Sequence, residues 1–344
     1  MPRSIDPDEV LAILRRIALA PTAPYHEWAA LDAIRGELES GGIATKTDQF
    51  GQLHARVSAG AAKRALVFAA HTDHPAFEVI EASGKTGRAR VLGGFRQRVF
   101  PPDVAVTVHD DAGTLSFAAA LTKPVSDVEP LHNSTTVCRI DAEEPLAVGQ
   151  YAVLDLPAAD VAGDEIRMRA ADDLAGCALI VSALRTLREE RAPHDVHAIF
   201  TRAEETGLYG ARLTAEDGLL PRDAYVVSVE ASRALPGAET GRGIVVRAGG
   251  PAQHIQQRGR ALPARRARAA RRARHPLTAR VAHRRDLRGL IVRPARLGRD
   301  GHRAAERQLS QRRRGRRICA GDRPSRRSAE RDRARRRGCS RRRN

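Results

Sequence analysis

Hydrophobic residues recur at helical spacing in two stretches near the start of the chain. Residues 6–20 place five apolar side chains on one face of a helix: Val10, Leu11, Ile13, Leu14 and Ile17. Asp6 stands just before them, where a carboxylate can cap the first turn. A second amphipathic stretch covers residues 27–38 and is followed by Gly41 and Gly42, which favour a helix end. We predict a helix in each stretch.

Short apolar runs predict strands in the following part of the chain. Residues 43–47 and 53–57 alternate around a turn, and residues 64–70 form an apolar run that is typical of a strand buried on both faces. Later in the chain, an apolar helix is predicted over 177–187 and strands over 196–200, 224–229 and 243–247. Strands that alternate with helices predict an α/β fold, with a sheet covered by helices.

The pattern changes between about residues 79 and 165. Four short alternating runs, broken by Gly, Pro and Asp, predict a small all-β module: 104–109, 114–119, 135–140 and 151–156. Asp110, Asp111, His132 and Asn133 are expected in its turns. We therefore predict a discontinuous α/β catalytic domain of residues 1–78 and 166–250, a β-barrel-like insert domain of residues 79–165, and a tail of residues 251–344.

The charge of the chain changes sharply at the start of this tail. The whole chain of 344 residues has a formal net charge of +18. After Gly250 there are 33 Arg against 6 Asp and Glu, so the first 250 residues hold 26 basic (59 − 33) and 35 acidic (41 − 6) residues. The first part is therefore an ordinary acidic globular sequence, and the basic character belongs to the tail alone.

Other features of the sequence favour a cytoplasmic protein. No apolar run approaches the roughly 18–20 residues of a membrane span, and the acidic start of the chain lacks the apolar core of a signal peptide. The four cysteines (Cys138, Cys177, Cys319 and Cys339) have neither disulfide-framework nor metal-ligand spacing.

Two adjacent carboxylates follow the predicted strand at 196–200. Neighbouring side chains at a strand end point in different directions. Glu205 can therefore bind a metal while Glu204 acts as general base for a water molecule, or the reverse. A pair of glutamates on a solvated helix face is the alternative at this point.

Further candidate ligands follow other strands or open a helix of the same predicted sheet. His71 ends the strand at 64–70, with Asp73 placed to orient its imidazole. Asp172 opens the apolar helix, and Glu230 follows the strand at 224–229. Charged groups gathered at one sheet edge are costly unless a metal compensates them. Their order and residue types indicate a site for two metal ions.

Four motifs resemble those of the tetrahedral, or deblocking, aminopeptidases (metallopeptidase family 42). HTDHPAF (71–77) is similar to H-x-D-x-x-G-F, AADDLAGCA (170–178) to L-D-D-R-x-G-x-A, FTRAEETGLYGA (200–211) to F-T-x-x-E-E-x-G-L-x-G-A, and YVVSVEAS (225–232) to the strand that ends in a carboxylate ligand. DQFGQL (48–53) also resembles the family's D-x-x-G-N-L. Ala76 stands where the family has Gly, and Glu230 where it more often has Asp.

This resemblance implies a zinc-exopeptidase-like α/β/α catalytic domain that hydrolyses N-terminal residues from peptides with two divalent ions, zinc or cobalt. His71, Asp172 and Glu230 would hold one ion, and Asp172 and Glu205 the other. Glu204 would be the general base and Asp73 would orient His71. The resemblance also implies a homo-oligomer. Aminoacylase-type or carboxypeptidase-type hydrolysis is the alternative within the wider clan, which shares these ligand types.

The resemblance ends near residues 247–250, before the last histidine ligand of the family. The tail that follows has no aromatic residue and is about one-third Arg, so we predict that it is disordered. One interpretation is a basic arm that binds nucleic acid. It lacks, however, the interleaved aromatic residues of single-strand binders.

A one-base frameshift in a GC-rich gene is the second interpretation of the tail. In such a gene most third codon positions are G or C. If a shift of the reading frame makes them first positions, the encoded sequence is rich in Arg, Ala, Gly and Pro. Codons chosen for residues 255–263 and 307–312 read, one base later, as FNNEAERYL and GNYHN, and the second string resembles the family's His-bearing segment. Under this interpretation the chain lacks the final ligand, and we predict impaired folding and activity.

Overall fold

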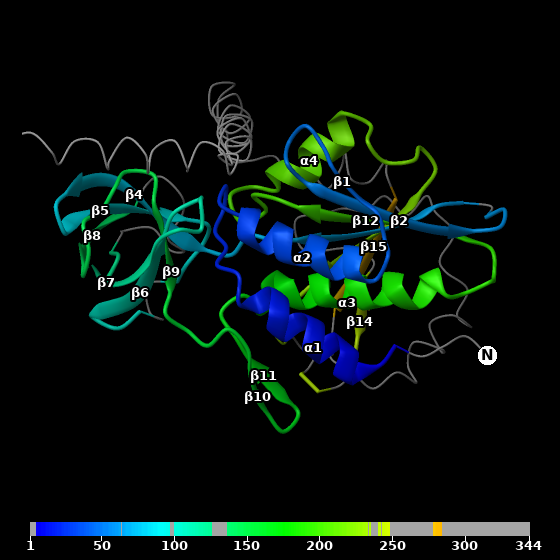
Figure 1. Cartoon of the computed structure of the whole chain (residues 1–344), viewed down its shortest axis with the longest axis horizontal. Helices are drawn as coiled ribbons and strands as arrows, with labels where there is room; N and C mark the ends of the chain where they lie inside the picture. The colour runs from blue at the N-terminus through cyan, green and yellow to red at the C-terminus, as the bar shows by residue number, and fades with distance from the viewer. Residues whose placement is uncertain are drawn as a thin grey trace, which may run out of the picture.

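The computed structural model describes residues 5–62, 64–96, 100–125, 136–232, 234, 240–241, 243–247 and 278–283. A mixed sheet forms the centre of its larger unit (Figure 1). The sheet has seven strands in the order β1 (Thr45–Thr47), β2 (Leu53–Ala59), β12 (His194–Thr201), β3 (Leu66–His71), β13 (Tyr225–Glu230), β15 (Thr278–His283) and β14 (Val245–Arg247). Strand β3 runs parallel to both β12 and β13, so the carboxyl ends of these three strands meet at one edge.

Three helices cover one face of the sheet: α1 (Pro7–Ala18), α2 (Trp28–Ser40) and α3 (Ala171–Arg188). Their apolar sides pack with Phe200 and Ala70 of the sheet in the main core. Alternate strand residues, among them Val67 and Ile199, face a second cluster on the other side. Helix α4 (Tyr209–Glu216) lies on that side of the sheet in Figure 1. The predicted α/β fold is confirmed.

A closed barrel is inserted between β3 and α3. Its strands lie in the order β4 (Ala76–Ser83), β5 (Thr86–Leu92), β8 (Val137–Ala142), β7 (Ser116–Thr122), β6 (Asp103–His109) and β9 (Tyr151–Leu154). Phe77, Phe95 and Phe100 stack within its core. A hairpin of β10 (Asp160–Ala162) and β11 (Glu165–Arg167) leads back to the sheet. The predicted β insert is therefore confirmed as a fold, while the domain boundaries stay a prediction.

The structure differs from the sequence-based expectations in two places. Strand β15 comes from the Arg-rich region and pairs antiparallel with β13, although we expected no strand after residue 250. The rest of the chain after residue 250 lies outside the described residues. His132 and Asn133 of the insert also lie outside them. Asp111, expected only in a turn, lies with its carboxylate 2.6 Å from Nδ1 of His26 and joins the barrel to the larger unit. No helix among the described residues is long and apolar enough to cross a membrane.

Candidate metal centre

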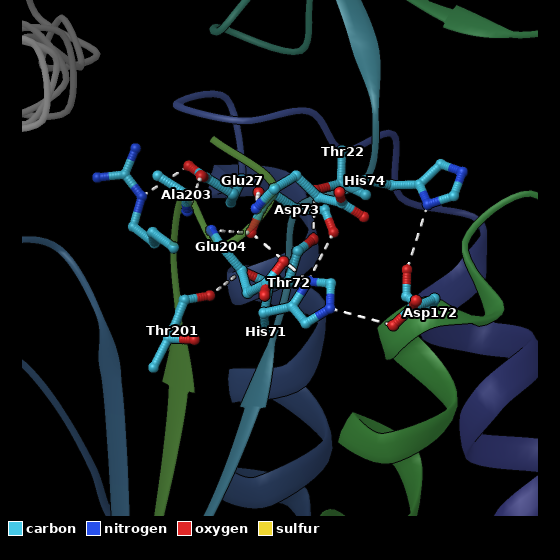
Figure 2. Close-up of polar contacts among 12 residues, drawn as sticks. Thr22, Glu27, His71, Thr72, Asp73, His74, Asp172, Thr201, Ala203 and Glu204 are labelled. Carbon is cyan, nitrogen blue, oxygen red and sulfur yellow. Dashed lines mark hydrogen bonds and ion pairs between the residues drawn. The ribbon is translucent and has the colours of Figure 1, made fainter. Parts of the chain in front are cut away.

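His71 lies at the carboxyl end of β3, beside Thr201 of β12. Its side chain is 3% exposed, and both ring nitrogens have partners. Nδ1 donates to the backbone oxygen of Asp73 at 3.0 Å, and Nε2 lies 3.1 Å from the Asp172 carboxylate and 3.7 Å from Glu230 (Figure 2). The Asp73 contact leaves Nε2 directed at the two acidic side chains. This nitrogen is the one placed to bind a cation.

The buried carboxylate of Asp73 holds the loop that carries the two adjacent glutamates. Its two oxygens accept the backbone N–H groups of Glu204 and Glu205, each at 2.9 Å. The same carboxylate lies 3.6 Å from Nδ1 of His71, farther than the Asp73 carbonyl. Asp73 therefore contacts His71 through its backbone oxygen, and its side chain ties the Glu204–Glu205 loop to the end of β3.

The start of α3 carries two acidic residues with different surroundings. Asp172 faces His71, and its backbone oxygen accepts a hydrogen bond from Nδ1 of His74 at 3.2 Å. Asp173 is fully buried and accepts the N–H of Gly176 at 3.2 Å. A Cβ on Gly176 would lie 2.3 Å from that Asp173 oxygen, so a larger residue at this position would displace the Asp173 side chain. Burial raises the pKa of Asp173 well above its usual value.

Two groups of side chains in the described part of the chain could hold a metal ion, and both contain His71. Asp172 and Glu230 complete the first group, and Glu204 and Glu205 complete the second. The ligand atoms within each group lie within 4.8 Å of one another. The first group matches the set that the family resemblance implies. The second contains Glu204 and not Asp172, whereas the resemblance pairs Asp172 with Glu205.

The electrostatics of the cluster favour a bound cation. Burial, together with the negative charges of Glu230, Asp73 and Asp172, raises the pKa of Glu204 to about 7, although His71 opposes this. Burial and the charges of Asp73 and Glu204 raise the pKa of Glu205 to about 9. Carboxylates that repel one another in a partly desolvated site are stabilised by a divalent ion. One imidazole and a group of carboxylates form a donor set that can bind a divalent metal ion.

Sequence reasoning missed two buried residues that support this site. Glu27 and Arg202 are both fully buried and form an ion pair, with Arg202 Nε 2.7 Å from Glu27 Oε2. Glu27 also accepts the backbone N–H of Ala203 at 2.9 Å. Glu27 stands at the start of a predicted amphipathic helix, where an acidic residue is unremarkable. The available signal was Arg202, a charged residue that directly follows the buried strand β12 and precedes the Ala-Glu-Glu segment.

The comparisons with known proteins agree with this geometry. The sequence profile of the M42 glutamyl aminopeptidase family matches residues 51–261, which extends past the limit near Gly250 that the motifs indicate. A search of curated protein sequences finds no match.

Solved structures of aminopeptidases share the fold. An aminopeptidase from the archaeon Desulfurococcus kamchatkensis is 21% identical, with a TM-score of 0.56 over 70% of this chain and 71% of its own. The Pyrococcus horikoshii TET1 peptidase, which can assemble into a tetrahedron or a large octahedral shell, is 18% identical, with a TM-score of 0.59 over 82% and 97%. A TET aminopeptidase from a marine sediment Thaumarchaeota archaeon is 19% identical, with a TM-score of 0.57 over 87% and 99%. With the profile covering more than half of its length, the chain belongs to the M42 family of metal-dependent aminopeptidases.

Proposed function

We propose that this chain removes N-terminal residues from peptides with two divalent ions, zinc or cobalt, held at the carboxyl edge of the sheet. The observation that carries the proposal is that two potential ligand groups share His71, one completed by Asp172 and Glu230 and the other by Glu204 and Glu205. His71, Asp172 and Glu230 would hold the first ion. Glu205 would bind the second together with Asp172, as the family resemblance implies.

When bound, such ions polarise the scissile carbonyl and make water acidic enough to supply a hydroxide near neutral pH. Glu204 would take a proton from the attacking water on its carboxylate. It would then deliver that proton to the leaving amine of the next residue, so the proton count balances. Asp73 keeps the loop of Glu204 and Glu205 against His71 through its two backbone hydrogen bonds.

We also propose that the second ion is held weakly in this chain. Among the described residues, no histidine other than His71 belongs to either ligand group. The resemblance implies a further histidine, which a frameshift after Gly250 would remove. Occupancy of a weak site follows mass action, so we expect low activity at micromolar metal and higher activity at millimolar metal. Full activity at micromolar metal would overturn this part of the proposal.

Mass spectrometry of a peptide digest tests the function. A decapeptide with a free N-terminus is incubated with metal-loaded protein, next to an N-acetylated copy and a copy with a C-terminal amide. We expect a ladder of products shortened from the N-terminus, and none from the acetylated copy. Loss of C-terminal residues would indicate a carboxypeptidase, and release of acetate an aminoacylase. Salt-sensitive DNA binding that survives chelation, without hydrolysis, would favour a nucleic-acid-binding tail.

We propose that the chain forms a homo-oligomer. The support is the fold that it shares with the TET peptidases, one of which is described as a dodecamer in the asymmetric unit. Light scattering coupled to size-exclusion chromatography is expected to show a species of several chains. A monomer of 37.4 kDa would contradict the proposal.

A further inference from the structure

Arg202 is the largest fully buried side chain among the described residues, and every part of its guanidinium has a partner. Nε donates to Glu27 at 2.7 Å, Nη2 to the carbonyl of Tyr25 at 2.8 Å and Nη1 to the carbonyl of Phe50 at 3.1 Å. Its carbon Cζ lies 3.9 Å from the centre of the Trp28 ring. Three segments that are far apart in the sequence are thereby joined directly behind the proposed site.

The partner of Arg202 also holds the backbone of the catalytic loop. Oε1 of Glu27 accepts the N–H of Ala203 at 2.9 Å, and the next two N–H groups, of Glu204 and Glu205, bind the Asp73 carboxylate (Figure 2). Ala203 has a positive φ of 54°, which is uncommon for a residue with a Cβ. Two buried carboxylates thus hold three successive amides in a turn that directs the glutamate side chains toward His71.

A buried ion pair of this kind is weak evidence for stability. The cost of desolvating two charges often equals or exceeds their attraction, and apolar residues of similar volume can replace such a pair without loss of stability. The geometry of the pair does, however, fix the orientation of the groups bound to it, because the planar guanidinium and the carboxylate each bind several groups at set angles. The pair is therefore better suited to fixing the position of the loop than to stabilising the fold.

We propose that the Glu27–Arg202 pair is a positioning device for Glu204 and Glu205, resting on the proposed function of that site. Neither residue contacts the ligand groups around His71, so both act through the backbone of residues 203–205. A misplacement of about 1 Å in a catalytic group can lower the rate by about 10²-fold. Loosening the pair should therefore lower kcat far more than it raises KM, and should also weaken metal binding through Glu205.

The test compares Glu27→Gln and the double variant Glu27→Leu/Arg202→Met with wild type. Glu37→Gln is the matched control. Glu37, near the C-terminal end of α2, is also buried and forms ion pairs with Arg16 of α1 and Arg185 of α3. Two quantities are measured on the full chain. One is kcat and KM for a leucyl anilide at saturating cobalt, and the other is hydrogen exchange of the amides of residues 203–205 in chelated protein.

We expect Glu27→Gln to lower kcat by about 10- to 100-fold, with KM changed by less than about threefold, and to speed exchange of the three amides about tenfold or more. The control should leave both readouts unchanged. If Glu27→Gln does not fold, kcat and amide exchange are compared between wild type and the apolar double variant, which is expected to fold. Wild-type kcat and wild-type exchange in either folded variant would overturn the positioning role. If wild type itself hydrolyses nothing, the proposed function fails, and the exchange rates alone decide the role of the pair.

Discussion

The contribution of the two adjacent glutamates to the stability of the metal-free protein is predicted to fall as pH rises above about 5. Glu204 has a pKa of about 7 in the folded chain and an ordinary value of 4.5 when exposed. A group whose pKa is raised on folding stabilises the fold fully below its unfolded pKa and loses that contribution as pH rises through the folded pKa. Glu205 shifts in the same direction, to about 9. The loss therefore begins near pH 4.5 and continues to about pH 9.

Glu204 alone sets the scale of the effect. The difference between about 7 and 4.5, at about 1.4 kcal/mol per pH unit, corresponds to about 3 kcal/mol of unfolding free energy lost by pH 7–8. Glu205 adds to this loss, but the two carboxylates repel each other, so their contributions are not additive. A divalent ion that binds the ionised carboxylates compensates their repulsion and desolvation, so saturating metal should abolish most of the pH dependence that these two glutamates cause.

Urea unfolding of protein that has been freed of metal with a chelator measures the pH dependence of the unfolding free energy directly. Trp28 is the only tryptophan of the chain and is 8% exposed, so its fluorescence reports the transition. His74 and His109, whose pKa values burial lowers to about 4, gain stability over part of the same range, so the contribution of Glu204 is obtained by comparison. Between pH 5 and 8 we expect the free energy of unfolding of wild type to fall relative to that of Glu204→Gln by about 3 kcal/mol. Glu216→Gln, on the surface of α4, is the control and should match wild type. The same change in unfolding free energy from pH 5 to 8 in metal-free wild type and Glu204→Gln would refute the electrostatic account of the site.

Three further predictions concern single residues. Glu204→Gln should lower kcat by about 10²- to 10⁴-fold with cobalt affinity reduced less than in Glu205→Gln; comparable activity of Glu204→Gln and wild type would exclude its role as base. Glu230→Gln should weaken the tighter of the two cobalt-binding steps, measured by calorimetry, by about tenfold or more, and an effect confined to the weaker step would contradict the assignment. Gly210→Ala should destabilise the metal-free fold by about 2 kcal/mol or more in the same urea assay, because its Cβ would lie 2.4 Å from the Arg202 backbone oxygen; an unchanged midpoint would mean that the loop adapts freely.

The larger part of the fold could be predicted because its elements carry strong local patterns. The apolar run that became β3 and the long apolar stretch of α3 lie where expected, since both are buried within one core. Strands β4 and β5 were not predicted. Strand β4 ends in three consecutive exposed residues, Glu81, Ala82 and Ser83, and β5 begins with three residues that are not buried, Thr86, Gly87 and Arg88, so the alternation is lost near the hairpin. Their pairing depends on closure of the barrel, which no local pattern shows.

The residues of the candidate site could be named because they follow strands that end at one sheet edge. What the sequence could not show is how the backbone holds them. The Asp73 carboxylate binds two amides of a loop more than 130 residues later in the chain, and Glu27 binds Arg202, which is 175 residues later. Such contacts join segments with no shared pattern, so only the folded arrangement shows them. The same holds for His26 and Asp111 between the sheet unit and the barrel.

Cobalt-dependent peptidase activity tests the central claim most directly. Chelated protein is titrated with cobalt from micromolar to millimolar concentration, and release of the N-terminal residue from a peptide is followed at each step for wild type and His71→Ala. We predict no activity without metal, activity in wild type that rises as the weaker site fills, and none in His71→Ala at any concentration. Equal activity in wild type and His71→Ala, or hydrolysis that persists in chelator, would contradict a metal centre built on His71.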